Sequence, residues 1–123
     1  MVNFISPWLY PVIWMALIFL GSSITLKEGI SPVTWADKAV HFVEYGILGI
    51  LFFYAFYKKS KQSSFFIIIL ISVFLSTVYG LSDEIHQIYV PTREFDLADL
   101  AADFCGSLFF CLVYCFYLKR RAS

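Results

Sequence analysis

Long apolar stretches alternate with short charged segments along this chain of 123 residues. Four apolar stretches stand out, at residues 7–26, 37–57, 62–82 and 97–118. Each has roughly 20 residues, and a helix of that length spans the ~30 Å hydrocarbon core of a bilayer. The pattern therefore predicts an all-α integral membrane protein with four transmembrane helices, folded as a single domain over residues 1–123.

The segments between these stretches predict the helix boundaries and the orientation. Gly29 and Pro32 indicate a turn over residues 27–32. The loop after the second stretch and the end of the chain are basic, with Lys58, Lys59, Lys61, Lys119, Arg120 and Arg121. Four spans place this loop and both termini on one side, and the positive-inside rule makes that side cytoplasmic. All nine acidic residues then lie outside or at the outer ends of helices.

The composition agrees with a membrane protein and excludes several other classes. Sixty per cent of the residues are hydrophobic and 15% are charged, whereas soluble domains average about 45–50% and about 25%. A disordered chain cannot keep so much apolar surface solvated, and nine basic against nine acidic residues leave no positive excess for a nucleic acid. Cys105, Cys111 and Cys115 lie in an apolar stretch without metal-ligand spacing, so we expect no disulfide.

Acidic residues and histidines interrupt the apolar pattern in three places. Asp37, His41 and Glu44 recur at i, i+4 and i+7, which puts them on one face of the second helix. Two further stripes share a helix face in the same way: Tyr79, Asp83 and His86, then Asp96, Asp99, Asp103 and Gly106. A carboxylate at bilayer depth costs about 2.5–3.5 kcal/mol, so such residues face a shared interior and indicate a functional site.

Each stripe also has a purely structural explanation. The helix dipole favours an acid such as Asp37 at a helix N-terminus by about 0.3–1 kcal/mol. His41 and Glu44 can pair with each other at i, i+3. Asp83 and Glu84 can be the solvated end of the third helix. Three such stripes are harder to explain in this way than one, so we expect a polar cluster at the outer face of the bundle.

Two motifs in this region resemble those of the VanZ-like family of small bacterial membrane proteins. The first motif is Asp37-Lys38-x-x-His41-Phe42-x-x-Tyr45-x-x-Leu48-Gly49. The second is Asp83-Glu84-x-x-Gln87-x-x-x-Pro91-x-Arg93, followed by Asp99, Asp103 and Gly106. The family often has Asn where this chain has Asp103, which is one departure from the pattern. The resemblance covers residues 37–106, over half of the chain.

The resemblance implies a multi-pass protein of the bacterial cytoplasmic membrane with a role in the cell envelope. The founding member of the family is associated with resistance to the glycopeptide antibiotic teicoplanin. The family name supplies this location and context and does not specify a reaction.

We hypothesise that the cluster binds a membrane lipid headgroup or a lipid-linked cell-wall precursor and catalyses hydrolysis or transfer at a phosphate or ester. The catalytic candidates are Asp37, His41, Glu44, Asp83, Glu84 and Asp99. The substrate-binding candidates are Lys38, Tyr45, His86, Gln87, Arg93 and Asp103. An arginine grips phosphate with two hydrogen bonds, and a histidine is a general base near neutral pH.

A divalent metal is a further hypothesis for the same cluster. Its candidate ligands are Asp37, His41, Glu84 and Asp99. An oxygen-rich set suits magnesium, calcium or manganese, and zinc needs the histidine as well.

Three other interpretations stay open at this point. The cluster can bind a lipid or a lipid-tailed antibiotic without reacting with it. Its residues can instead pair internally and set the helix register, while the loops bind another membrane protein. A proton- or ion-coupled carrier is the weakest of the three, because the acids gather at one face rather than across the span.

Overall fold

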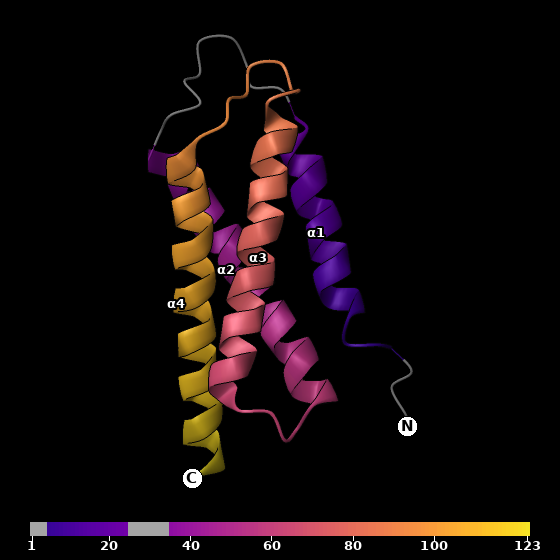
Figure 1. Ribbon diagram of the computed structural model, residues 1–123, viewed down its shortest axis with the longest axis vertical. Coiled ribbons are helices and arrows are strands. Elements are labelled where there is room, and N and C mark those ends of the chain that lie inside the picture. Colours follow the sequence, from indigo (N-terminus) through magenta and orange to yellow (C-terminus); the bar gives the residue numbers. More distant parts are fainter. Residues whose placement is uncertain (1–4, 25–34) are drawn as a thin grey trace.

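The computed structural model describes residues 5–24 and 35–123, and within them it contains helices and no strands (Figure 1). The helices are α1 (Leu9–Ser22), α2 (Trp35–Lys59), α3 (Phe65–Gln87) and α4 (Leu97–Ala122). The prediction of an all-α fold built from four helices is therefore confirmed. The turn expected at residues 27–32 lies outside the described residues.

Three of the described helices, α2, α3 and α4, are long and apolar enough to cross a membrane. The first helix is shorter than the sequence pattern predicted. It has 14 residues and is about 21 Å long, whereas the hydrocarbon core is ~30 Å thick. It ends where the hydroxyls of Ser22 and Ser23 both donate to the carbonyl of Phe19, at 3.0 and 2.7 Å. Serine side chains compete in this way with the backbone for helix carbonyls, and the described residues Ser23 and Ile24 already lie outside the helix.

The third helix is longer than predicted, because it continues to Gln87 rather than ending at residue 82. Asp83, Glu84 and Gln87 are therefore helical, with exposed fractions of only 5%, 0% and 3%. The alternative that Asp83 and Glu84 form a solvated helix end is wrong for this reason. Their burial between neighbouring helices supports the last turn of α3, which sequence hydropathy alone does not favour.

Close contact between α2 and α4 organises the bundle. Gly106 of α4 lies against the backbone of Phe42 in α2, where a Cβ atom would overlap the Phe42 carbonyl. Elsewhere in the contact between α2 and α4, a Cβ on Gly49 of α2 would come within 3.0 Å of the Cβ atom of Ser107 in α4. Small residues let two helix backbones approach in this manner. Polar side chains near this crossing are thereby brought within hydrogen-bonding reach.

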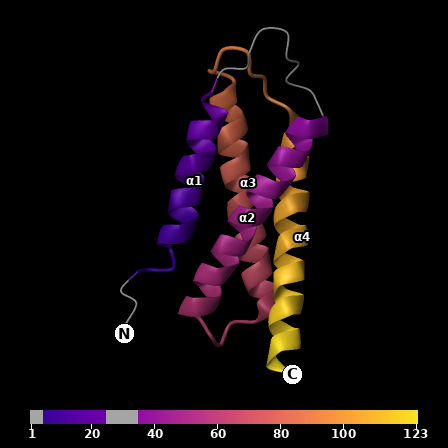
Figure 2. The ribbon, with the colours of Figure 1, turned by 180° about the vertical axis from the view of Figure 1, so that it is seen from behind.

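The α1 helix lies at the edge of the bundle. The Trp14 indole donates to the backbone carbonyl of Glu44 at 2.9 Å, and the Tyr79 hydroxyl donates to that of Met15 at 2.6 Å. Seen from behind, α2 runs obliquely between α4 and α1 (Figure 2). In both views α1 and α4 lie at opposite edges of the bundle. The polar contacts of His41 in α2 go to α3 and α4.

The two ends of the bundle differ in charge. At one end, the start of α2, the end of α3 and the start of α4 come together (Figure 1). We call this the acidic end, because it carries Asp37, Glu84, Asp96 and Asp99. The opposite end holds the 60–64 loop and the end of α4, and we call it the basic end, with Lys58, Lys59, Lys61 and residues 119–121.

Candidate functional site

His41 is the centre of a buried cluster where α2, α3 and α4 meet. Its Nδ1 atom shares a hydrogen bond of 2.9 Å with Oδ1 of Asp103. Its Nε2 atom faces Asp99 Oδ2 at 3.7 Å and Glu84 Oε1 at 3.9 Å. The imidazole is almost fully enclosed, since His41 is 4% exposed. One imidazole therefore meets three carboxylates that come from two other helices.

Tyr45 supports the histidine from one turn further along α2. The two rings are stacked, with centroids 6.0 Å apart and planes 4° from parallel. The hydroxyl of Tyr45 donates to Oδ2 of Asp83 at 3.2 Å, and Tyr45 has no exposed surface. The stack fixes the plane of the imidazole, and the hydroxyl ties α2 to the carboxylate of α3.

Lys38 links α2 to the start of α4. Its ammonium donates to Asp96 Oδ2 at 2.5 Å and to Asp99 Oδ1 at 2.6 Å. Asp96 also caps α4 by accepting from the Ala98 N–H, and its own N–H donates to Glu84 Oε2 at 2.9 Å. The Lys38 ammonium, followed by the Ala98 N–H, holds the pKa of the Asp96 carboxyl below its usual range. Asp96 therefore stays ionised as part of this network.

Several carboxylate oxygens in the cluster lack a hydrogen-bond partner among the described residues. They are Asp83 Oδ1, Glu84 Oε1 and Asp103 Oδ2, and all three residues are at least 95% buried. A buried, unpaired polar group normally costs about 1–3 kcal/mol, and more when it is charged. The cluster therefore has capacity to bind a cation or a proton donor.

Two groups of side chains have potential ligand atoms close enough together to hold a metal ion, and His41 belongs to both groups. Asp37, His41 and Asp99 make the first group, and His41, Glu84 and Asp103 make the second, with the ligand atoms of each group within 4.8 Å of one another. The four metal candidates from the sequence thus lie around one histidine. Mainly oxygen donors with one imidazole suit magnesium, calcium or manganese, and the imidazole also admits zinc.

A cavity of about 260 Å³ opens beside the first group. We call it the acidic pocket, and it is lined by Asp37, Gln87, Arg93, Glu94, Phe95, Asp96 and Asp99. Arg93 is the cation among these residues, and its Nε atom donates to the carbonyl of Ile24 at 3.2 Å. Asp37 and Asp99 therefore connect the buried cluster to a space that a small polar group can enter. None of the described residues that line the pocket is Ser, Thr or Cys.

Comparison with known proteins gives the family. The family model VanZ/LLP1 matches residues 7–118, nearly the whole chain. The chain belongs to the VanZ/LLP1 family. It is also 28% identical over 109 residues to an uncharacterized protein of Schizosaccharomyces pombe, with 89% of this chain and 64% of the relative aligned. The chain thus spans less than two thirds of that relative's length, and no solved structure matches it.

Two of the predicted site residues form no ion pair or hydrogen bond with His41 among the described residues of this VanZ-family protein. Glu44 is half-buried, and the ion-pair contacts of His41 among the described residues go to Glu84, Asp99 and Asp103 instead. The alternative that His41 pairs with Glu44 at i, i+3 is therefore not what the structure shows.

His86 is the second of these residues. It faces α1, with Nε2 3.1 Å from Ser23 Oγ and its ring 4.5 Å from that of Phe19. Although the sequence places His86 on the same helix face as Asp83, the His86 side chain contacts Ser23 and Phe19 rather than the His41 cluster.

Other residues that line or support the candidate site were not among the candidates taken from the sequence. Asp96 binds Lys38, and Glu94 and Phe95 line the acidic pocket. Gly80 lies against Asp103 Oδ2, so a side chain at Gly80 would displace that carboxylate. A signal for Gly80 was present, because it precedes Asp83 by three residues and so shares its helix face.

Proposed function

We propose that this VanZ-family membrane protein binds a divalent cation at the acidic end of its bundle and uses it to hold the phosphate or ester headgroup of a lipid. The proposed outcome is hydrolysis or transfer at that group. The observation that carries the proposal is the set of buried carboxylate oxygens without a partner around His41. Glu84 and Asp103 form one group of potential ligands with His41, and Asp37 and Asp99, which form the other group with His41, line the acidic pocket.

The charge of the cluster supports a cation. Four carboxylates, Asp83, Glu84, Asp99 and Asp103, are at most 5% exposed. The nearest positive groups are Lys38 and, when protonated, His41. Moving an ionised carboxylate out of water costs several kcal/mol even after relaxation, so an excess of buried negative charge needs a further counter-charge. A divalent ion bound beside His41, the residue shared by the two ligand groups, would supply two positive charges.

The residues have separate roles in this proposal. Asp37 and Asp99 line the acidic pocket, so they present the cation to a headgroup there. Asp103 is fully buried and acts through His41, whose ring it orients. A carboxylate that hydrogen-bonds the remote nitrogen of an imidazole fixes which nitrogen faces the metal. In this proposal Asp103 is a positioning residue, whereas the sequence suggested that it binds the substrate.

Arg93 and Gln87 are the proposed headgroup contacts. Both line the acidic pocket, and Arg93 is the group there that can pair with phosphate. The cation would act as a Lewis acid on the bound phosphate or ester. Because none of the described lining residues offers a hydroxyl or thiol nucleophile, we propose that water or a substrate hydroxyl attacks the phosphate or ester and that Asp37 accepts its proton. The bond to the leaving alcohol breaks, and the alcohol takes up the proton from Asp37 as it departs.

The biological setting belongs to the same proposal. We place the acidic end at the outer face of a bacterial cytoplasmic membrane, where an envelope lipid or lipid-linked cell-wall precursor is available. The distribution of lysine and arginine supports this orientation. The association of the family's founding member with teicoplanin resistance supports an envelope substrate and a contribution to glycopeptide resistance.

A structural role is the second candidate, and specific contacts favour it. Lys38 with Asp96 and Asp99, and His41 with Asp103, already join α2 to α4. In this alternative the protein binds a lipid or a partner protein without chemistry. The two candidates differ in whether the cluster takes up a metal.

Metal binding by the purified protein distinguishes the metal-dependent function from the structural role. We expect detergent-purified protein, first stripped with a chelator, to bind about one Mn²⁺ or Mg²⁺ per chain in calorimetry, with zinc as a comparison. The variant Asp99→Asn should lose this binding. Glu94→Gln is the matched control, since Glu94 lines the acidic pocket but belongs to neither ligand group. Folded wild-type protein that binds none of these ions would contradict the proposal and favour the structural role.

A further inference from the structure

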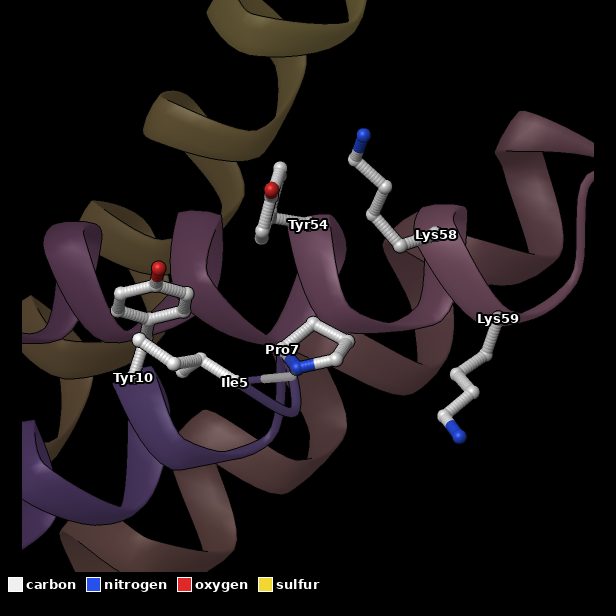
Figure 3. Close-up of a pocket in the computed structure, with 6 residues that line it drawn as sticks. All are labelled: Ile5, Pro7, Tyr10, Tyr54, Lys58 and Lys59. Carbon is white, nitrogen blue, oxygen red and sulfur yellow. The ribbon is translucent and has the colours of Figure 1, made fainter. Parts of the chain in front are cut away.

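A second cavity lies at the basic end of the bundle, between the start of α1 and the end of α2. Its volume is about 440 Å³. We call it the lysine–tyrosine pocket, and it is lined by Ile5, Pro7, Tyr10, Tyr54, Lys58 and Lys59 (Figure 3). The acidic pocket shares no residue with it, so the two cavities are separate sites.

The polar groups of this pocket are two phenol hydroxyls and two ammonium groups, and none of the described lining residues is acidic. The rings of Tyr10 and Tyr54 meet edge to face, with centroids 6.1 Å apart. The ammonium of Lys58 lies 5.6 Å from the centre of the Tyr54 ring, within cation–π range. Tyr54 therefore helps to hold Lys58 in place.

The two lysines of the pocket are arranged differently. Figure 3 shows Lys58 beside Tyr54, while Lys59 extends away in another direction. Lys58 and Lys59 also border an adjoining cavity of about 400 Å³ together with Ser60, Lys61 and Gln62. Lys61 lines only this second cavity, so it provides positive charge nearby without belonging to the lysine–tyrosine pocket.

The surroundings of the pocket are positive and match the edge of a membrane. After Glu44, α2 contains no acidic residue, and α4 ends at the same end of the bundle with Lys119, Arg120 and Arg121. Tyrosine is enriched where a membrane helix meets the headgroups, and lysines next to a membrane helix attract anionic lipids. Ile5 and Pro7 add an apolar wall on which the glycerol end of a lipid can lie.

We propose that the lysine–tyrosine pocket binds the phosphate of an anionic membrane phospholipid. Lys58 pairs with the phosphate, the tyrosine hydroxyls donate to its oxygens, and the acyl chains follow the exposed apolar surface of α1, which includes Leu9 and Ile13. This site does not depend on the cation or the chemistry proposed for the acidic pocket. An acidic pocket repels a phosphate unless a cation is bound, whereas this pocket attracts it directly.

Lipid binding measured by native mass spectrometry tests the proposal. Purified protein in detergent is titrated with dioleoylphosphatidylglycerol, and with dioleoylphosphatidylcholine as the neutral comparison. We expect preferential binding of the phosphatidylglycerol, and about fivefold weaker binding for Lys58→Gln, the loss typical of one lysine near a membrane surface. Tyr54→Leu, which removes the ring beneath Lys58, should weaken binding in the same direction.

Lys61→Gln is the matched control, because it removes the same charge from a neighbouring position outside the pocket. Equal losses for Lys58→Gln and Lys61→Gln would overturn the proposal and indicate a diffuse attraction. Equal binding of the two lipids would overturn it as well. If millimolar inorganic phosphate displaces the lipid, the site recognises a free anion rather than a phospholipid. Circular dichroism of each variant separates these results from a loss of fold.

Discussion

The imidazole of His41 and the carboxylate of Asp103 meet at 2.9 Å inside the bundle, although 62 positions separate them in the chain. Both residues are buried, at 4% and 0% exposure. The contact exists because α2 and α4 cross closely where Gly106 lies against the Phe42 backbone. A close crossing therefore supports a polar pair that would otherwise be costly in an apolar bundle.

Removing the Asp103 carboxylate tests the importance of this pair. Asp103→Ala leaves the Nδ1 atom of His41 buried without its partner, so we expect a loss of about 1–3 kcal/mol in unfolding free energy. Asp103→Asn keeps an oxygen acceptor in the same place and should lose less. Thermal unfolding in detergent compares the two variants. An alanine variant as stable as the asparagine variant would show that the pair adds nothing to stability.

The close approach of α2 and α4 predicts that Gly106 cannot be enlarged. Gly106→Ala places a methyl group on the Phe42 carbonyl, and the helices must move apart at a cost of about 1–3 kcal/mol. Gly21→Ala is the control, because nothing lies within 4 Å of a Cβ at Gly21. Unfolding temperatures should fall for the first variant and stay equal or rise slightly for the second. Equal unfolding temperatures for the two variants would count against the crossing described for α2 and α4.

Lys38 is expected to stabilise the start of α4 through charge. Lys38→Met keeps the length of the side chain but leaves Asp99 buried without its cation, and we expect a loss of about 1–3 kcal/mol. Lys38→Arg keeps the charge and should recover most of this loss. Chemical unfolding in mixed micelles measures both variants. The ion pair is unimportant if methionine and arginine give the same stability.

The lowered pKa of Asp96 predicts a dependence of stability on acid pH. Hydrogen bonds from Lys38 and the Ala98 N–H keep this carboxylate ionised in the folded protein below its ordinary value of 3.8. The stabilisation is complete above that ordinary value, and it disappears as the pH falls through the lower folded value. The stability advantage of wild type over Asp96→Asn should therefore shrink below about pH 4. An advantage that stays constant from about pH 7 to about pH 3 would contradict this assignment.

The proposed orientation predicts which end of the bundle is reached from outside the cell. In a chain whose Cys105, Cys111 and Cys115 are replaced by alanine, a cysteine at Glu94 should react with an impermeant maleimide added to intact cells. A cysteine at Lys59 should react only after the cells are opened. Labelling of the Lys59 position from outside would reverse the orientation and place the acidic end in the cytoplasm.

Local patterns were sufficient to predict most of the helical structure. Apolar length predicted α2, α3 and α4, because a membrane-spanning helix satisfies its backbone hydrogen bonds within itself. The same rule overestimated α1, since two serine hydroxyls compete for the Phe19 carbonyl at its end. It also ended α3 too early, because the acids of its last turn are stabilised by other helices rather than by solvent.

The candidate site was predictable only in part. The i, i+4 spacing predicted that Asp37 and His41 share a helix face, and their side-chain ligand atoms do lie within 4.8 Å of each other, because neighbours on a helix face are determined locally. The same spacing suggested that His41 pairs with Glu44 and that His86 joins the cluster, and neither is found. Those choices depend on which helix lies opposite each face.

The sequence by itself determined the membrane class, three long helices and the faces that carry polar residues, since these follow from hydropathy and the 3.6-residue period. Only the tertiary structure decided that Asp103 is the partner of His41 and that Asp96 binds Lys38. It also decided that Lys58 and Tyr54 share a pocket with the start of α1. Helix faces are properties of short segments, whereas the pairing of faces depends on how closely whole helices pack, and here glycines at the crossings allow that approach.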